Sequence, residues 1–315
     1  MRSPEVVTAG EALLAVVPSE PLPFEDASSF LTFVGGAEVN FAICLSQLGV
    51  DVAWHGHLGD DPAGRKVLRA LTDAEVSTAL VRSWPDERTG LYLRDWRPDG
   101  VRRPSYYRAR SAARHLHPRH WPADATATRW LHLTGITAAL GDGPRALLEH
   151  LLEWARASGL RISFDPNYRP ALWSAAEAAP VLRALAAQAD VVLLSEEDAE
   201  LLFGDLAPEA TLEAALGLGP GIAVLKRGAR GALAAADGVV HHVAPAPAQA
   251  VDPVGAGDAF DAGLVAALLE RRPLEEALRL GALLGARATE QAGEHPPAVV
   301  PSARAVEIDL GRSQA

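Results

Sequence analysis

The chain has 315 residues, 49% hydrophobic and 22% charged, and is long enough to bury a sizeable core in one large α/β domain or two ordinary ones. Its formal net charge of −11 and isoelectric point near 5.4 argue against nucleic acid or an anionic membrane as a partner, since both bind a basic surface. The single cysteine, Cys44, excludes an intrachain disulfide and a thiolate metal cluster, and we expect it to be a buried core thiol.

The N-terminal residues run directly into the apolar stretch VVTAGEALLAVV at 6–17. This start lacks the basic leader and the small-residue cleavage site of a signal peptide. No apolar run reaches the roughly 18 residues that a membrane-spanning helix needs. We therefore expect a soluble cytoplasmic protein.

In the first third of the chain, apolar runs alternate with turn residues. A β-rich stretch with a polar flank is predicted near 13–32, and an amphipathic helix over about 37–48, closed by Gly49. A strand at 50–58, a DDPAG loop and another helix follow. The segment 91–110 alternates around the turn Pro98, Asp99 and Gly100, which indicates a hairpin. We expect 12–32 and 88–112 to form a small β lid over a site.

From about residue 114 onward, short β-rich runs alternate with helical stretches rich in Ala, Leu and Arg. Strands are predicted at 130–136, 161–165 and 190–195, and helices near 143–158 and 174–188. This alternation is typical of βαβ units in a parallel, doubly wound sheet. No repeat or linker divides the chain. We therefore predict an α/β fold in a single domain over 1–315.

The most informative segment is AVDPVGAGDAFDAGLVAALLE at 250–270, where Gly255, Ala256 and Gly257 precede an apolar helical run. Small residues let backbone amides approach a ligand at a helix N-terminus, an arrangement that binds phosphate. Asp258, in the first helical turn, is placed to accept a proton from an attacking hydroxyl. We expect the helix dipole to lower its pKa. A tight turn followed by an ordinary helix carboxylate would give the same pattern.

The segment DPVGAGDAF at 252–260 resembles the C-terminal signature of PfkB-type, ribokinase-like carbohydrate kinases. GGAEVNFAICLSQLG at 35–49 and GHLGDDPAG at 56–64 resemble their N-terminal signature, and the similarity runs over nearly the whole chain. The resemblance implies a three-layer α/β/α sandwich with a mostly parallel central sheet and a small β-sheet lid. It also implies ATP-dependent phosphorylation of a sugar hydroxyl, with Asp258 as the base and 255–258 as an anion hole.

Three segments bear on the sugar. Gly35 and Gly36 precede a helix whose first turn contains Asn40, which offers both a donor and an acceptor, although an ordinary helix start fits equally. Arg108 on the lid and Arg169 after a strand end are suited to a carboxylate, but they are also typical of a solvated strand face and a structural turn.

Together these segments resemble the 2-keto-3-deoxygluconate kinase branch of the family, which phosphorylates the terminal (6-) hydroxyl of a sugar acid. The substrate contacts that the resemblance implies are Gly35, Gly36, Ala37, Glu38, Val39, Asn40, Tyr92, Tyr106, Tyr107, Arg108, Arg169, Asp252 and Asp258. Asp252 is an alternative candidate for positioning a cation. The resemblance does not separate the gluconate from the galactonate epimer.

The segment IAVLKRGARGALAA at 222–235 indicates two strands around a glycine turn that can meet nucleotide phosphates, although a plain hairpin needs no ligand. The resemblance implies ATP contacts at Asn167, Ser195, Lys226, Arg227, Gly228, Ala229, Arg230, Gly231, Gly255, Ala256, Gly257, Asp258 and Ala282. It also implies Mg²⁺, with a monovalent cation and GTP use left open. Ser195 and Asp198, where relatives often carry a magnesium-organising motif, are spaced equally well as a helix capping pair, so no direct metal ligand is assigned.

Two other functions fit parts of this pattern. A kinase of the same fold acting on a neutral ketose such as fructose differs only in its lid and arginines. A catalytically silent sugar or nucleotide sensor would not need Asp258 beside its glycine loop. We expect a sugar acid and ATP as small-molecule partners, no nucleic acid and no membrane, and a homo-oligomer if a lid edge strand pairs with its copy.

Overall fold

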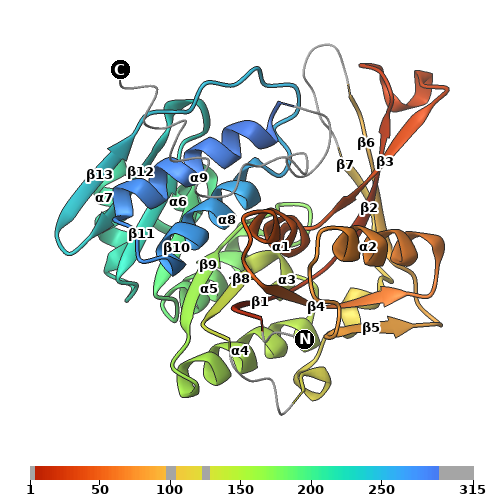
Figure 1. Ribbon diagram of the computed structural model, residues 1–315, viewed down its shortest axis with the longest axis horizontal. Helices are drawn as coiled ribbons and strands as arrows, with labels where there is room; N and C mark the ends of the chain where they lie inside the picture. Colours follow the sequence, from red (N-terminus) through yellow and green to blue (C-terminus); the bar gives the residue numbers. More distant parts are fainter. Residues whose placement is uncertain (1–3, 97–103, 123–127, 291–315) are drawn as a thin grey trace.

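The computed structural model describes residues 4–96, 104–122 and 128–290. Its central feature is a nine-stranded sheet in the order β13-β12-β11-β10-β9-β8-β1-β4-β5 (Figure 1). The β11–β12 and β12–β13 pairs are antiparallel, and the other pairs are parallel. Its strands are β1 (Val6–Ala9), β4 (Val52–Gly59), β5 (Val81–Trp84), β8 (Trp130–Thr134), β9 (Arg161–Asp165), β10 (Val191–Ser195), β11 (Ile222–Lys226), β12 (Ala232–Ala236) and β13 (Val239–Val243).

Helices cover both faces of this sheet, which completes three layers (Figure 1). One face packs against α1 (Ala37–Gln47), α2 (Pro62–Asp73), α8 (Ala256–Leu269) and α9 (Leu274–Ala288). The other face packs against α3 (Gly135–Ala138), α4 (Asp142–Ala157), α5 (Ala175–Ala186), α6 (Glu196–Phe203) and α7 (Pro208–Leu216). Because parallel strands are covered on both sides, β4 and β8 are buried along their whole length, as their apolar sequences require.

A second sheet projects from the large one at the upper right of Figure 1. Its order is β3-β2-β6-β7, with β2 (Leu13–Pro18), β3 (Phe30–Gly35), β6 (Gly90–Arg94) and β7 (Pro104–Tyr107). The β2–β6 pair is parallel, while β2–β3 and β6–β7 are antiparallel. The predicted pairing of 91–110 is therefore present, but its turn at Pro98, Asp99 and Gly100 lies outside the described residues. The predicted α/β sandwich with a small β lid is confirmed.

Short 3₁₀ turns complete the described chain: η1 (Phe24–Asp26), η2 (Ala112–His115), η3 (Pro118–His120) and η4 (Gly228–Arg230). Cys44 is buried in the core between α1 and its neighbours, as expected. In the ranges given above, no helix combines the length and the apolar character needed to cross a membrane.

The topology fixes where a ligand can bind. In a parallel sheet, all strands end at the same edge, and open α/β sheets bind ligands outside the carboxyl ends of their strands. Asp165, Ser195 and Lys226 are the last residues of β9, β10 and β11, and Ser195 pairs directly with Lys226 in the register. Three polar side chains from distant parts of the sequence therefore meet at one edge.

Candidate active site

A cavity of about 870 Å³ lies between the small sheet and the carboxyl edge of the large sheet. Most of the predicted site residues line this one space. From the predicted substrate set, it includes Gly36, Ala37, Asn40, Tyr92, Tyr106, Arg108, Arg169 and Asp258. From the predicted nucleotide set, it includes Asn167, Ser195, Lys226, Arg227, Gly228, Ala229, Gly231, Gly255, Ala256, Gly257, Asp258 and Ala282. The two sets meet at Asp258.

Six predicted residues do not line the cavity: Gly35, Glu38, Val39, Tyr107, Arg230 and Asp252. Tyr107 follows an inward-facing Tyr106 on β7, so the alternation of a strand turns it outward, where it is 60% exposed. Arg230 is largely exposed and pairs with Glu196 at the start of α6.

Glu38 and Val39 are buried in α1, beside cavity-lining Ala37 and Asn40. Helical rotation turns Glu38 toward the sheet, where its Oε1 accepts hydrogen bonds from Thr134 Oγ1 at 2.7 Å and Thr137 Oγ1 at 2.8 Å. Burial raises the pKa of Glu38 to about 7. Glu38 thus contacts α3 and the end of β8.

Gly36 and Gly255 are glycines for steric reasons. Gly36, before α1, has φ of 127°, and a β-carbon there would lie 2.2 Å from the Glu11 carbonyl oxygen. Gly255, the N-cap of α8, has φ of 80° in the left-handed region, which glycine adopts without strain. These conformations set the entry of α1 and α8, the helices that carry Asn40 and Asp258.

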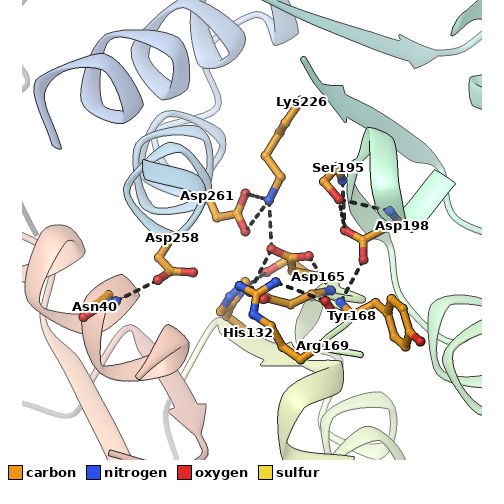
Figure 2. A network of polar contacts seen from close by, with 12 residues as sticks. Asn40, His132, Asp165, Tyr168, Arg169, Ser195, Asp198, Lys226, Asp258 and Asp261 are labelled. Atoms are coloured by element: carbon orange, nitrogen blue, oxygen red, sulfur yellow. Dashed lines mark hydrogen bonds and ion pairs between the residues drawn. The ribbon is translucent and has the colours of Figure 1, made fainter. Parts of the chain in front are cut away.

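Asp258 lies in the first turn of α8 and its carboxylate faces Asn40 of α1 (Figure 2). Asn40 Nδ2 donates a hydrogen bond of 2.8 Å to Asp258 Oδ2. We predicted that the helix dipole would lower the pKa of Asp258, and this prediction is wrong. Burial raises its pKa to about 6, with a further increase from the charge of Asp165, against lowering by Asn40, Arg169 and Lys226. A carboxylate with this pKa is a better proton acceptor at neutral pH than an ordinary aspartate.

Arg108 projects from the small sheet into the cavity but is not a free cation. It forms an ion pair with buried Glu11, whose other oxygen accepts a hydrogen bond from Ser111 Oγ at 2.6 Å. Its guanidinium carbon lies 5.2 Å from the centre of the Tyr106 ring. The sequence analysis missed Glu11, which lies two residues after the end of β1 at the carboxyl edge of the sheet.

Arg94 is a second residue that the sequence analysis missed. It faces inward on β6, two residues after Tyr92, and its guanidinium binds Asp252 through two hydrogen bonds of 2.8 and 2.6 Å. Both side chains are 3% exposed. The strand alternation that starts from Tyr92 could have identified Arg94. Asp252 therefore contacts the lid, and it also accepts a 3.3 Å hydrogen bond from Val254 N in the loop before α8.

The loop after β9 carries Asn167 and Arg169. Asn167 has φ of 43°, and its backbone N donates to Asp165 Oδ1 at 2.9 Å. Arg169 donates to the Tyr168 carbonyl at 3.1 Å, and within the described ranges no carboxylate forms an ion pair with it. Among the cations that line the cavity, Arg169 is therefore the one whose charge is least neutralised by a nearby carboxylate.

Ser195 and Asp198 form a capping box at the start of α6. Asp198 Oδ2 accepts hydrogen bonds from Ser195 N and Oγ, and its Oδ1 accepts one of 2.8 Å from Tyr168 N (Figure 2). Both oxygens of this cavity-lining carboxylate thus accept hydrogen bonds from the protein, in agreement with the capping interpretation of this pair. In the described part of the chain, no group of three acidic, histidine or cysteine side chains is arranged to hold a metal ion.

Lys226 is held between two buried carboxylates at the cavity wall. Its Nζ lies 2.8 Å from Asp165 Oδ2 and 2.9 and 3.1 Å from the two oxygens of Asp261. Asp165 ends β9, so the strand-edge rule could have found it. Asp261 lies inside α8, and its sequence position gives no comparable signal.

Comparison with known proteins agrees with this fold. The family model of the pfkB family carbohydrate kinases matches residues 4–299. The chain is 31% identical to a 2-dehydro-3-deoxygluconokinase of Bacillus subtilis (strain 168), over 92% of this chain and 91% of that protein.

Two solved structures are also similar. A 2-dehydro-3-deoxygluconokinase from Thermotoga maritima has a TM-score of 0.88 and 26% identity, covering 97% of this chain and 99% of that one. A fructokinase from Vibrio cholerae O395, bound to fructose, ADP and calcium, has a TM-score of 0.84 and 27% identity, covering 98% and 99%. The chain belongs to the pfkB family and is a carbohydrate kinase. Kinases of this family bind a sugar and ATP.

Proposed function

We propose that this kinase transfers the γ-phosphoryl group of ATP to the terminal (6-) hydroxyl of 2-keto-3-deoxygluconate, also called 2-dehydro-3-deoxygluconate. The hydroxyl oxygen forms the new bond to phosphorus as the bond to the ADP oxygen breaks, and the hydroxyl proton passes to the Asp258 carboxylate. The products are the 6-phosphate ester and ADP. Because the pKa of Asp258 is about 6, the carboxylate is ionised and ready to accept that proton at neutral pH.

The observation that carries the sugar-acid assignment is the charge of the sugar end of the cavity. Arg169 lines it without a carboxylate partner, and Arg108 faces it beside Tyr106. Glu11 neutralises Arg108, so in a chain of net charge −11 it is Arg169 that makes this part of the cavity locally favourable for an anion. A substrate carboxylate could accept two hydrogen bonds from the Arg169 guanidinium. A neutral sugar would leave this charge unpaired.

The nucleotide end of the proposed site combines the 255–258 loop, Lys226 and the backbone of 227–231. The N-terminus of the 14-residue helix α8 directs backbone N–H groups and a partial positive charge toward bound phosphate. Magnesium bound with ATP would neutralise phosphate charge.

A neutral ketose such as fructose is the alternative substrate, and the similarity to the fructokinase of Vibrio cholerae favours keeping it in the test. Tyr92 and Asn40 in the same cavity can bind sugar hydroxyls of either substrate class. The difference between the two hypotheses therefore depends on the arginines.

The test measures ADP formation by the purified protein with Mg-ATP and 2-keto-3-deoxygluconate, its galactonate epimer, fructose or ribose. We expect turnover with the sugar acids and its loss in Asp258→Ala. We expect Arg169→Gln to lower kcat/KM for a sugar acid by about 10- to 100-fold, the equivalent of a charge-assisted contact, and to change any activity on fructose far less. Arg82→Gln, an arginine outside the cavity, is the matched control.

Equal losses for sugar acid and fructose in Arg169→Gln would contradict a carboxylate contact. Turnover with fructose or ribose alone would favour the ketose or pentose reading and leave the kinase chemistry in place. If Asp258→Ala retained full activity, the assignment of the base would be wrong.

A further inference from the structure

Lys226 stands out in the composition of the chain. Of the 29 lysine and arginine residues, only Lys66 and Lys226 are lysines. Lys66 lies on the exposed side of α2, whereas the Lys226 side chain is 12% exposed and lines the cavity. A compact ammonium therefore occupies a buried position in a protein that otherwise uses the larger, planar guanidinium group almost throughout.

Three oxygens fix the position of this ammonium. Figure 2 shows Lys226 reaching down from β11 between Asp261 of α8 and Asp165 of β9. The contact of 2.8 Å is made to Asp165, and those of 2.9 and 3.1 Å are made to the two oxygens of Asp261. A β-carbon built on Gly257 would lie 3.7 Å from Lys226 Nζ, so the amine sits directly against the 255–258 loop.

The two carboxylates differ in their relation to the cavity. Asp165 and Lys226 line it, whereas Asp261 does not. Asp261 is three residues after Asp258 on the same helix, so α8 carries both the proposed base and a side chain that holds the lysine from behind. Asp261 can affect a phosphoryl group in the cavity only through its neighbours Lys226 and Asp165, of which Lys226 is the cation.

We propose that Asp261 is a positioning residue for phosphoryl transfer, which holds the Lys226 ammonium against the 255–258 loop so that it faces the transferred phosphoryl group. This inference rests on the proposed kinase reaction. What is added to the proposed reaction is a role for Asp261, which holds the Lys226 ammonium in place. Asp261 itself neither contacts the substrates nor exchanges a proton with them.

The charge of this triad supports the proposal. Burial raises the pKa of Asp261 well above its usual value, and nearby Asp165 adds to this effect against the opposing charge of Lys226. Lys226 lowers the pKa of Asp165 against the effect of burial. The two carboxyl groups are therefore biased in opposite directions, and Asp261 is the one that holds a proton more readily. A proton held on Asp261 reduces the repulsion of an incoming phosphate that two ionised carboxylates would cause.

The raised pKa of Asp261 makes asparagine its closest substitute. A neutral amide of the same shape can accept from Lys226 through its oxygen and donate to Asp165 through its nitrogen. Alanine can do neither. We therefore expect Asp261→Asn to keep kcat within about threefold, whereas Asp261→Ala lowers it by about 100-fold, the cost of misplacing a catalytic contact by about 1 Å.

The kinetic test is a double-mutant cycle on the full chain with Mg-ATP and the best sugar of the panel. Because Asp261 acts through Lys226, Lys226→Met and Lys226→Met/Asp261→Ala should have the same kcat. The KM for the sugar should change little in all four variants. Additive losses in the double variant, or an Asp261→Ala enzyme with normal kcat, would overturn the proposal.

A second measurement separates positioning from misfolding and from failure of the proposed reaction. Protein labelled with [¹³C,¹⁵N]lysine contains two lysine spin systems, with exposed Lys66 as the internal reference. We expect the Lys226 Cε and Nζ signals to shift when MgADP is added to wild type and to Asp261→Asn, and to be displaced before any addition in Asp261→Ala. Signals that are the same in wild type and Asp261→Ala would overturn the positioning role.

These readouts do not depend on the sugar. If the wild type phosphorylated no sugar but the Lys226 signals responded to MgADP as described, the proposed substrate would fail while the positioning role of Asp261 stood. If Asp261→Asn lost as much activity as Asp261→Ala although both melted like wild type, hydrogen bonding at this position would not be enough to hold Lys226 and the proposal would fail.

Discussion

The Asp258 carboxyl group has neighbours that act on its proton affinity in opposite directions. Burial and the negative charge of Asp165 raise the pKa, while the Asn40 hydrogen bond and the cations Arg169 and Lys226 lower it. Desolvation is the largest effect, which is why the pKa is near 6 despite the helix N-terminus. The sequence could predict that Asp258 lies at a helix N-terminus, but not that its carboxylate is buried. The burial depends on α1 packing against α8.

This balance gives a pH prediction. The base must be ionised, so kcat/KM should fall as pH drops through about 6, the folded-state pKa of Asp258. Asn40 stabilises the ionised form, so Asn40→Ala should raise this pKa and move the acid limb to higher pH. The measurement is kcat/KM for the sugar between pH 5 and about 9 for both proteins.

Tyr106→Phe, which leaves the Asn40–Asp258 bond in place, is the control and should keep the wild-type acid limb. An acid limb that stayed in place in Asn40→Ala would mean that the titrating group is not Asp258.

At the level of elements, periodicity predicted which segments form strands and helices. The strand at 161–165 agrees with β9 at both ends, and the helix near 174–188 corresponds to α5 (Ala175–Ala186). Periodicity did not assign individual side chains of α1 to a face. Glu38 and Asn40 are both polar and both buried, and only the packed positions of α3 and α8 send Glu38 to Thr134 and Asn40 to Asp258.

The helices α5 and α6 allow a matched comparison between a capping serine away from the cavity and one that lines it. Both α5 and α6 begin with a serine capping box, at Ser174 and Ser195. Each Ser→Ala change should reduce the free energy of unfolding by about 1 kcal/mol. Because only Ser195 lines the cavity, Ser195→Ala should also raise the KM for ATP, whereas Ser174→Ala should leave it unchanged.

Urea denaturation and initial-rate kinetics on both variants test this prediction. A rise in the KM for ATP in Ser174→Ala would show that loss of stability, not the position of Ser195, alters nucleotide binding.

For the whole molecule, the Arg94–Asp252 ion pair joins the small sheet to the loop that precedes α8. Its partners are 158 positions apart in the sequence and are both nearly fully buried. An ion pair of this kind contributes most clearly when one partner is removed, because the remaining charge is left in a medium that solvates it poorly. The pair therefore links the lid sheet to the segment that leads into the 255–258 loop.

Single substitutions should reveal this connection. Arg94→Met and Asp252→Leu should each lower the free energy of unfolding by about 3–5 kcal/mol, and the double variant should lose less than the sum because no charge is left unpaired. Urea denaturation, followed by probes in both sheets, provides the measurement. Additive losses would argue that the two side chains act independently.

The sequence by itself determined the layered fold, because strand ends and apolar periodicity are local patterns. Its resemblance to a known family supplied the family and many of the cavity-lining residues. Gly255 to Asp258 illustrate this: the small residues and the helix start are visible in nine letters. Tertiary structure alone decided how charges pair. Arg108 with Glu11, Arg94 with Asp252, and Lys226 with Asp165 and Asp261 all join residues distant in sequence. Electrostatic energies depend on distance and burial in three dimensions, and neither is encoded in the spacing of residues along the chain.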